Sequence, residues 1–174
     1  ADADLARIIR RLMDEEVTPV LKLPRGADVE SYKRDLITRF HNPGLRHRTW
    51  QIAMDGSQKL PQRLLGTIRD RLAMGAPIPL LALGVAAWMR YVTGIDEAGK
   101  PIDVRDPLAA ELRRRADAAG RDAAALASAL LSMTQIFGTD LPAKPAFTGP
   151  VTNALHALLR DGTRATLGRA AKGA

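Results

Sequence analysis

The sequence contains no cysteine, few aromatic residues and no long uninterrupted hydrophobic run. Without cysteine, disulfides, thiolate catalysis and cysteine-based metal sites are excluded, and an intracellular, cytoplasmic protein is favoured. The three histidines, His41, His47 and His156, do not have the spacing of a zinc motif, so we predict no metal site. The longest apolar run, residues 76–89, is shorter than the ~20 residues that cross a bilayer. It predicts a buried helix, and no membrane partner is expected.

What is present favours helix. Hydrophobic residues make up 46% of the 174 residues, aromatics only 4%, and alanine is abundant. Extended Val/Ile/Thr alternation is absent, whereas apolar residues recur at three- and four-residue steps. We therefore predict an all-α, multi-helix domain over residues 1–160. The expected helices lie near residues 5–13, 29–40, 60–72, 79–92, 107–119, 122–137 and 149–160.

Short polar residues predict where several of these helices begin. Asp106 and Thr148 are expected N-caps for the helices near Pro107 and Pro150, and Asp55 is expected to cap a helix that starts near Ser57. The Gly/Ala/Arg-rich residues 161–174 are expected to fray.

The charge is concentrated in one stretch. The formal net charge is +7, and residues 24–72 alone contain ten basic and five acidic side chains. This basic stretch predicts an anionic partner, either a small carboxylate or phosphate ligand or a nucleic acid.

Several familiar catalytic and cofactor motifs are missing. The sequence has no GxGxxG after a strand, no GxxxxGK[ST] and no GxSxG, so dinucleotide binding, Walker-type phosphate binding and an esterase nucleophile are unsupported. Ser57, His47 and Asp55 have the residue types of a hydrolytic triad, but three such residues within eleven positions occur often by chance.

The most informative stretch is RFHNPGLRHRTWQIAMDGSQKLPQR, residues 39–63. It is preceded by EEVTPVL (15–21) and followed by GIDEAGKPIDVRDPLA (94–109). Together these blocks resemble the C-terminal helical domain of the mannitol dehydrogenase family, and most closely its fructuronate reductase, or D-mannonate oxidoreductase, branch.

The resemblance implies that this chain is the C-terminal part of a longer enzyme. Family members have an N-terminal Rossmann domain that binds NAD, and they bind a sugar acid or polyol in the cleft between the two domains. Their catalytic Lys/Asn/His signature is absent here, because the nearest spacing, Lys33 to His41, has Thr38 at the asparagine position. We therefore expect no catalytic or cofactor-binding residue in this chain, no metal and no activity of the isolated chain.

The same resemblance implies a substrate-binding wall around Lys59, the lysine that follows the DGS turn. Gln51 stands where the polyol branch tends to have an arginine. Arg48 is the candidate replacement, because its planar guanidinium suits a uronate carboxylate. His47 is a candidate donor to a sugar hydroxyl, with helix packing as its structural alternative.

Two functions of other classes stay open at this point. A nucleic-acid-binding module would use the basic residues 24–72, but acidic residues interrupt them and aromatic residues are few. A helical scaffold that has no catalytic half would expose the same apolar interface. The reading frame upstream of Ala1 would distinguish the scaffold from the enzyme.

Overall fold

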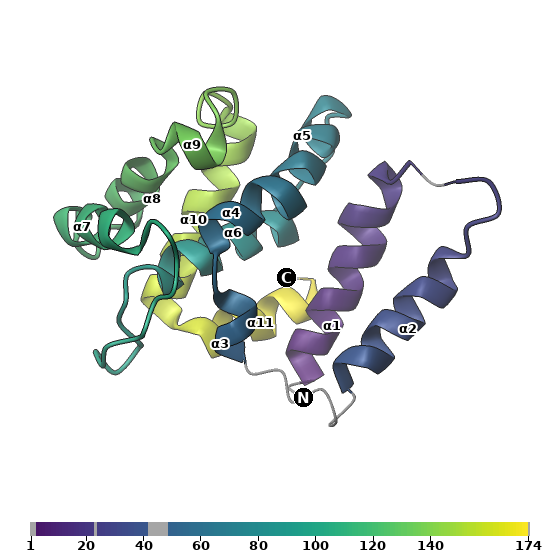
Figure 1. Cartoon of the computed structure of the whole chain (residues 1–174), viewed down its shortest axis with the longest axis horizontal. Helices are drawn as coiled ribbons and strands as arrows, with labels where there is room; N and C mark the ends of the chain where they lie inside the picture. The colour runs from purple at the N-terminus through teal and green to yellow at the C-terminus, as the bar shows by residue number, and fades with distance from the viewer. Residues whose placement is uncertain (1–2, 23, 42–48, 174) are drawn as a thin grey trace.

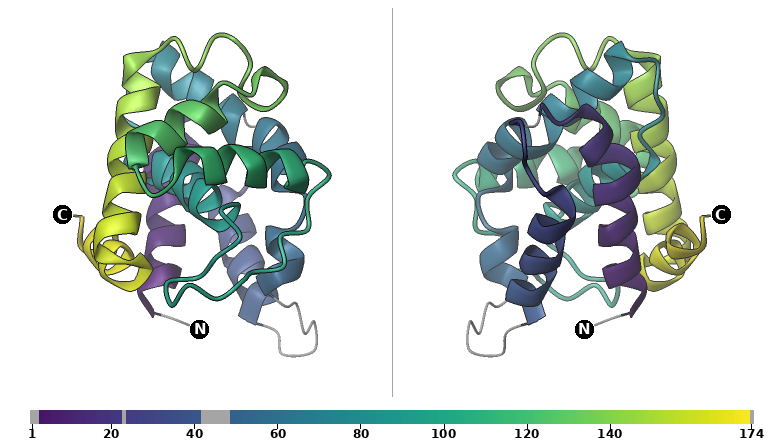
Figure 2. Two further views of the ribbon diagram at one scale, coloured as in Figure 1. Left: turned by 90° about the vertical axis from the view of Figure 1, so that its left-hand side faces the viewer. Right: turned by 90° about the vertical axis from the view of Figure 1, so that its right-hand side faces the viewer.

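The most apolar stretch of the sequence forms the central helix of the fold. In the computed structural model, which describes residues 3–22, 24–41 and 49–173, this helix is α6 (Pro79–Tyr91), and most of its side chains are buried. Pro79 begins this helix, as expected, because the N–H group that proline lacks would have no intrahelical acceptor at this position. The long helix α10 (Pro145–Asp161) packs along α6 (Figures 1 and 2). The all-α prediction is confirmed.

The remaining helices surround this pair (Figure 1). α1 packs against α11 near the two ends of the chain, α7 packs against α8, and α2 lies beside α1 at one edge. Their bounds are α1 Ala3–Arg11, α2 Val29–His41, α3 Thr49–Ala53, α4 Gly56–Leu60, α5 Gly66–Ala73, α7 Ala109–Ala119, α8 Ala123–Leu131, α9 Thr134–Phe137 and α11 Thr163–Lys172.

Two π-helical segments lengthen these helices. Residues Leu12–Val17 (η1) continue α1, and a 3₁₀ turn at Thr18–Val20 (η2) follows them. Residues Pro61–Leu65 (η4) join α4 to α5, so that residues 56–73 are helical throughout.

Three aromatic residues pack together in the core. Trp88 meets Phe137 edge-on with ring centroids 6.1 Å apart, and Phe137 packs against Phe147 at 6.3 Å. Such offset contacts are the favoured arrangement of aromatic rings. They tie α6, α9 and α10 together around one hydrophobic core.

Three sequence-based expectations need correction. Residues 122–137 form two helices rather than one, because the first ends at Leu131, where the Ser132 hydroxyl donates to the Ala129 carbonyl. The helix expected to start near Gly149 begins earlier, at Pro145, so Thr148 lies inside it and does not cap it.

The C-terminal residues provide the third correction. Residues 163–172 form helix α11 instead of fraying, and Ala171 and Thr166 are buried. Glu97 accepts a hydrogen bond from the Thr163 N–H at 2.6 Å, and Arg11 donates to the Ala170 carbonyl. Contacts with α1 and with the 94–102 loop thus stabilise a helix that the local composition alone does not predict.

An exposed ion pair predicts part of the acid sensitivity of the fold. Arg69 on α5 donates two hydrogen bonds to Asp140, and its guanidinium holds the pKa of that carboxyl well below its usual 3.8. A carboxyl whose pKa is lowered on folding stabilises the protein above its unfolded pKa, and this contribution is lost as the pH falls toward the folded pKa. Asp140→Asn should therefore reduce the drop in melting temperature between neutral pH and about pH 2. The matched control is Asp70→Asn, which removes an exposed carboxyl from α5; an equal drop in both variants would contradict the assignment.

Candidate functional site: the turn before Lys59

The DGS turn at residues 55–57 has an unusual backbone. Asp55 has a φ of 57° and is the only residue other than glycine with a positive φ in the described part of the chain. Its carbonyl accepts hydrogen bonds from the N–H groups of Gln58 and Lys59, at 3.0 and 2.9 Å. Left-handed backbone of this kind is uncommon in non-glycine residues and concentrates at functional positions. The turn therefore starts α4 with a sharp change of direction.

Asp106, rather than Asp55, caps this helix. The expectation that Asp55 would do so is wrong, since its side chain makes no capping hydrogen bond. Instead, Asp106 accepts the Ser57 N–H at 2.8 Å and the Ser57 hydroxyl at 2.6 Å. The Asp55 N–H is bound by the carbonyl of Arg105 at 3.0 Å. A segment 49 residues away thus satisfies the donors of the turn.

Asp106 also binds the turn just ahead of α7, but the N-cap position of that helix is Leu108 and not Asp106 as expected. Its carboxylate accepts the Leu108 N–H at 2.9 Å and its carbonyl accepts the Ala109 N–H at 3.0 Å, just where α7 begins. One carboxylate therefore joins the starts of two helices, α4 and α7.

Gly56 fixes the other side of the turn. A Cβ placed on Gly56 would lie 2.2 Å from Nε1 and 2.5 Å from Cδ1 of Trp88, closer than any real contact. Trp88 is itself almost completely buried. Only glycine allows α4 to approach the central helix this closely.

Lys59 lies in the last turn of α4 and is half-buried. Its ammonium Nζ donates to the carbonyl of Ile52, in α3, at 3.2 Å. An ammonium has three N–H donors, so one bond to Ile52 leaves capacity for the oxygens of a ligand. Gln51 is an exposed residue of α3. Its neighbour Ile52 is 53% exposed.

The structure thus brings Lys59 close to α3, which carries Gln51. The other two predicted substrate-binding residues, His47 and Arg48, lie outside the described residues. His41 is described only as part of the α2 backbone.

Lys33, which has part of the catalytic spacing, is a structural residue. Its side chain is 8% exposed, and its ammonium donates to Asp14 at 2.7 Å and to Glu30 at 2.9 Å. These two carboxylates raise the pKa of Lys33. A lysine held in its charged form in this way does not suit proton exchange near neutral pH.

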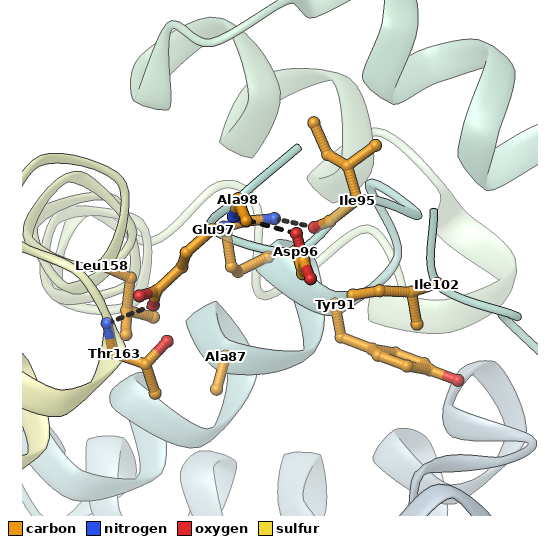
Figure 3. A pocket seen from close by; sticks show the side chains of 10 residues that line it. Ala87, Tyr91, Ile95, Asp96, Glu97, Ala98, Ile102, Leu158 and Thr163 are labelled. Atoms are coloured by element: carbon orange, nitrogen blue, oxygen red, sulfur yellow. Dashed lines mark hydrogen bonds between the residues drawn. The ribbon is translucent and has the colours of Figure 1, made fainter. Parts of the chain in front are cut away.

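A separate cavity of about 520 Å³ lies where the 94–102 loop meets α6, α10 and α11 (Figure 3). Its walls are mostly apolar, with Ala87, Ile102 and Leu158 among them. Glu97 reaches across it to the N-terminus of α11, where Thr163 lowers the pKa of its carboxyl. Arg90 donates to the Ile95 carbonyl at 2.6 Å. The polar groups at this cavity therefore hold the loop in place.

The described residues form neither a metal centre nor a membrane span. Within residues 3–22, 24–41 and 49–173, no three carboxylate or histidine side chains gather where they could share a metal ion. No helix in this part of the chain is both long and apolar enough to cross a membrane.

Comparison with known proteins decides the family. Residues 1–159 match the family described as Mannitol dehydrogenase C-terminal domain. The chain belongs to this family. The mannitol dehydrogenase resemblance of the three sequence blocks is thereby confirmed.

Relatives that the chain matches include proteins named as oxidoreductases. D-mannonate oxidoreductase of Escherichia coli (strain K12) is 51% identical over 154 residues, which cover 88% of this chain and 31% of that protein. The uncharacterized oxidoreductase YdfI of the same organism is 49% identical over 158 residues, which cover 91% of this chain and 32% of that protein.

A solved structure gives the same result. Mannitol 2-dehydrogenase of Pseudomonas fluorescens, in ternary complex with NAD and D-mannitol, superposes with a TM-score of 0.90 at 32% identity. The match covers 99% of this chain and 34% of that one. The chain thus spans about a third of the length of the relatives it matches.

Sequence reasoning missed the contact between Ser57 and Asp106. Capping patterns extend over only a few residues, so they relate each of the two residues to its local helix alone. The available signal was that both lie in blocks that resemble the same family, DGSQK and IDVRDPLA.

Proposed function

We propose that this chain is the substrate-side C-terminal domain of an NAD-dependent oxidoreductase. The longer enzyme would interconvert fructuronate and mannonate, or a related ketose and polyol. The observation that carries this proposal is the 51% identity to D-mannonate oxidoreductase over 88% of the chain. The clamped turn before Lys59 supports it, because a constrained donor is what a hydroxyl-rich substrate requires.

Each proposed substrate residue has a distinct role. Lys59 donates hydrogen bonds to substrate oxygens, and Arg48 binds the carboxylate of the sugar acid through two parallel N–H groups. His47 and Gln51 provide further polar contacts with substrate hydroxyls. These residues bind and orient the substrate; the proton donor for the carbonyl belongs to the Lys/Asn/His signature that this chain lacks.

The dinucleotide is assigned to another part of the enzyme. The described residues contain only an isolated bridge between Ile95 and Pro101 and no strand, so they cannot form the strand–turn–helix unit that cradles a pyrophosphate. NAD supplies hydride transfer when bound. We propose that an N-terminal Rossmann domain of the same polypeptide holds it, that the isolated chain is inactive and that the enzyme is cytoplasmic.

Part of the basic charge of residues 24–72 is used within the fold, which favours a small anion over nucleic acid as the partner. In residues 24–72, Lys33 pairs with two carboxylates, Arg69 pairs with Asp140, and the buried Arg71 donates to the carbonyls of Pro77 and Glu15. Charges used in this way do not form the continuous stripe that a nucleic-acid backbone requires.

The experiment is steady-state kinetics on the full-length enzyme with mannonate and NAD. Lys59→Met and Arg48→Ala should each raise KM at least about tenfold, since a hydrogen bond from a charged group to the substrate is lost. Lys100→Met, in an exposed loop, is the matched control and should leave KM unchanged. Wild-type KM values in both substrate-wall variants would overturn the assignment, and turnover by the isolated chain would contradict its predicted inactivity.

A further inference from the structure

We propose that Asp106 is a positioning residue for substrate binding, which acts through the DGS turn on Lys59. The proposal rests on the proposed function, because it takes Lys59 as the residue that contacts the substrate. It adds that the recognition lysine depends on a carboxylate from the start of α7, which lies far away in the sequence. Asp106 itself is not expected to touch the substrate.

Ser57 places two buried donors in the DGS turn. Ser57 is only 5% exposed, so neither its N–H nor its hydroxyl can rely on water for a partner. Asp106 accepts from both, through a different carboxylate oxygen for each. A buried donor without an acceptor is strongly disfavoured. The position of Ser57 is therefore set by Asp106.

Asp55 is constrained from two sides. Its left-handed backbone is held on one side by the bond from its N–H to the Arg105 carbonyl, next to Asp106 in the chain. On the other side its carbonyl accepts the N–H of Lys59 itself, at 2.9 Å. Arg105 thus holds the turn at Asp55, and Asp106 holds it at Ser57. The backbone position of Lys59 depends on this turn. A backbone in this region persists only where its surroundings determine it.

A short helix connects the turn to the ammonium group of Lys59. α4 has only five residues, so Lys59 lies within one turn of the clamped Ser57. At its far end, Nζ is braced by the Ile52 carbonyl at 3.2 Å. A rotation of the turn would shift Lys59 relative to α3, and displacements of about 1 Å are enough to weaken substrate positioning.

The test uses the full-length enzyme and four variants. Asp106→Asn keeps the size of the side chain but replaces the oxygen that accepts the Ser57 N–H by an amide donor. Asp117→Asn is the matched control and should leave KM unchanged, since it makes the same change on α7 at an exposed carboxylate that pairs with Arg113. Lys59→Met and the double variant Asp106→Asn/Lys59→Met complete a thermodynamic cycle.

The expected result is a rise in KM for mannonate of about fivefold in Asp106→Asn, with kcat within about twofold of wild type. The same substitution in the Lys59→Met background should leave KM unchanged, because the group through which it acts is gone. A merely structural role would lower the melting temperature equally in both backgrounds and would not produce this difference in KM.

Each outcome decides the proposal. An equal rise in KM with and without Lys59, or no rise in Asp106→Asn, overturns the positioning role while the proposed function stands. No effect of Lys59→Met overturns the role of Lys59 in substrate binding, and with it the positioning role of Asp106. If Asp106→Asn fails to fold, Ser57→Ala removes only the hydroxyl bond, and a KM rise of about twofold that disappears in the Lys59→Met background gives the same decision.

Discussion

Replacing Gly56 by alanine is expected to destabilise the protein by about 3 kcal/mol, although the change adds a single methyl group. In an ordinary helix the same substitution stabilises by about 0.5–1 kcal/mol, because glycine loses more conformational freedom on folding. The sign is reversed here because the new Cβ would lie 2.2 Å from Nε1 of Trp88. Trp88 has no easy way to withdraw, since it packs edge-on against the fully buried Phe137.

Gly66 provides a matched control within the same helical stretch. It begins α5, is exposed, and an added Cβ would meet nothing within 4 Å. Gly66→Ala should therefore be neutral or stabilising by up to about 1 kcal/mol. Urea unfolding followed by circular dichroism measures both variants. If Gly56→Ala proved as stable as Gly66→Ala, the close approach of α4 to Trp88 would be refuted.

Helix positions followed well from the sequence where periodicity was strong. The apolar run at 76–89 gave α6 to within a few residues, and the stripe that begins at Val29 gave α2. Boundaries that depend on tertiary contacts were wrong. Residues 163–172 have a composition typical of a loose end, yet Glu97 caps them from a loop 66 residues away. Local composition contains no information about such a partner.

The candidate site was less predictable than the fold. Lys59 followed from the family resemblance, not from any pattern that separates a binding lysine from a surface one. The sequence did indicate a turn at DGS, but it favoured Asp55 as the cap. The side chain of Asp55 loses that role because its backbone is left-handed, whereas Asp106 arrives from another element with both oxygens aligned. Charge alone could not distinguish two aspartates that each precede a helix.

Glu16→Gln should also destabilise the fold by about 3 kcal/mol, despite its near-identical size. The Glu16 side chain is 2% exposed and accepts the N–H groups of Leu80 and Leu81 at 2.7 and 2.9 Å. It thereby satisfies the first turn of α6, and its negative charge favours the positive end of that helix. Glutamine retains one acceptor and turns an amide donor toward the other N–H, which leaves a buried donor without a partner.

Glu15, the neighbouring residue, provides the matched control. Its side chain is 50% exposed and pairs with Arg11 within one helical turn, an arrangement that contributes little in water. Glu15→Gln should cost less than about 1 kcal/mol in the same unfolding measurement. Hydrogen exchange adds a local readout, because loss of the Glu16 carboxylate should speed exchange at the Leu80 and Leu81 amides before the rest of α6. Equal unfolding free energies for the two variants would show that η1 does not anchor the central helix.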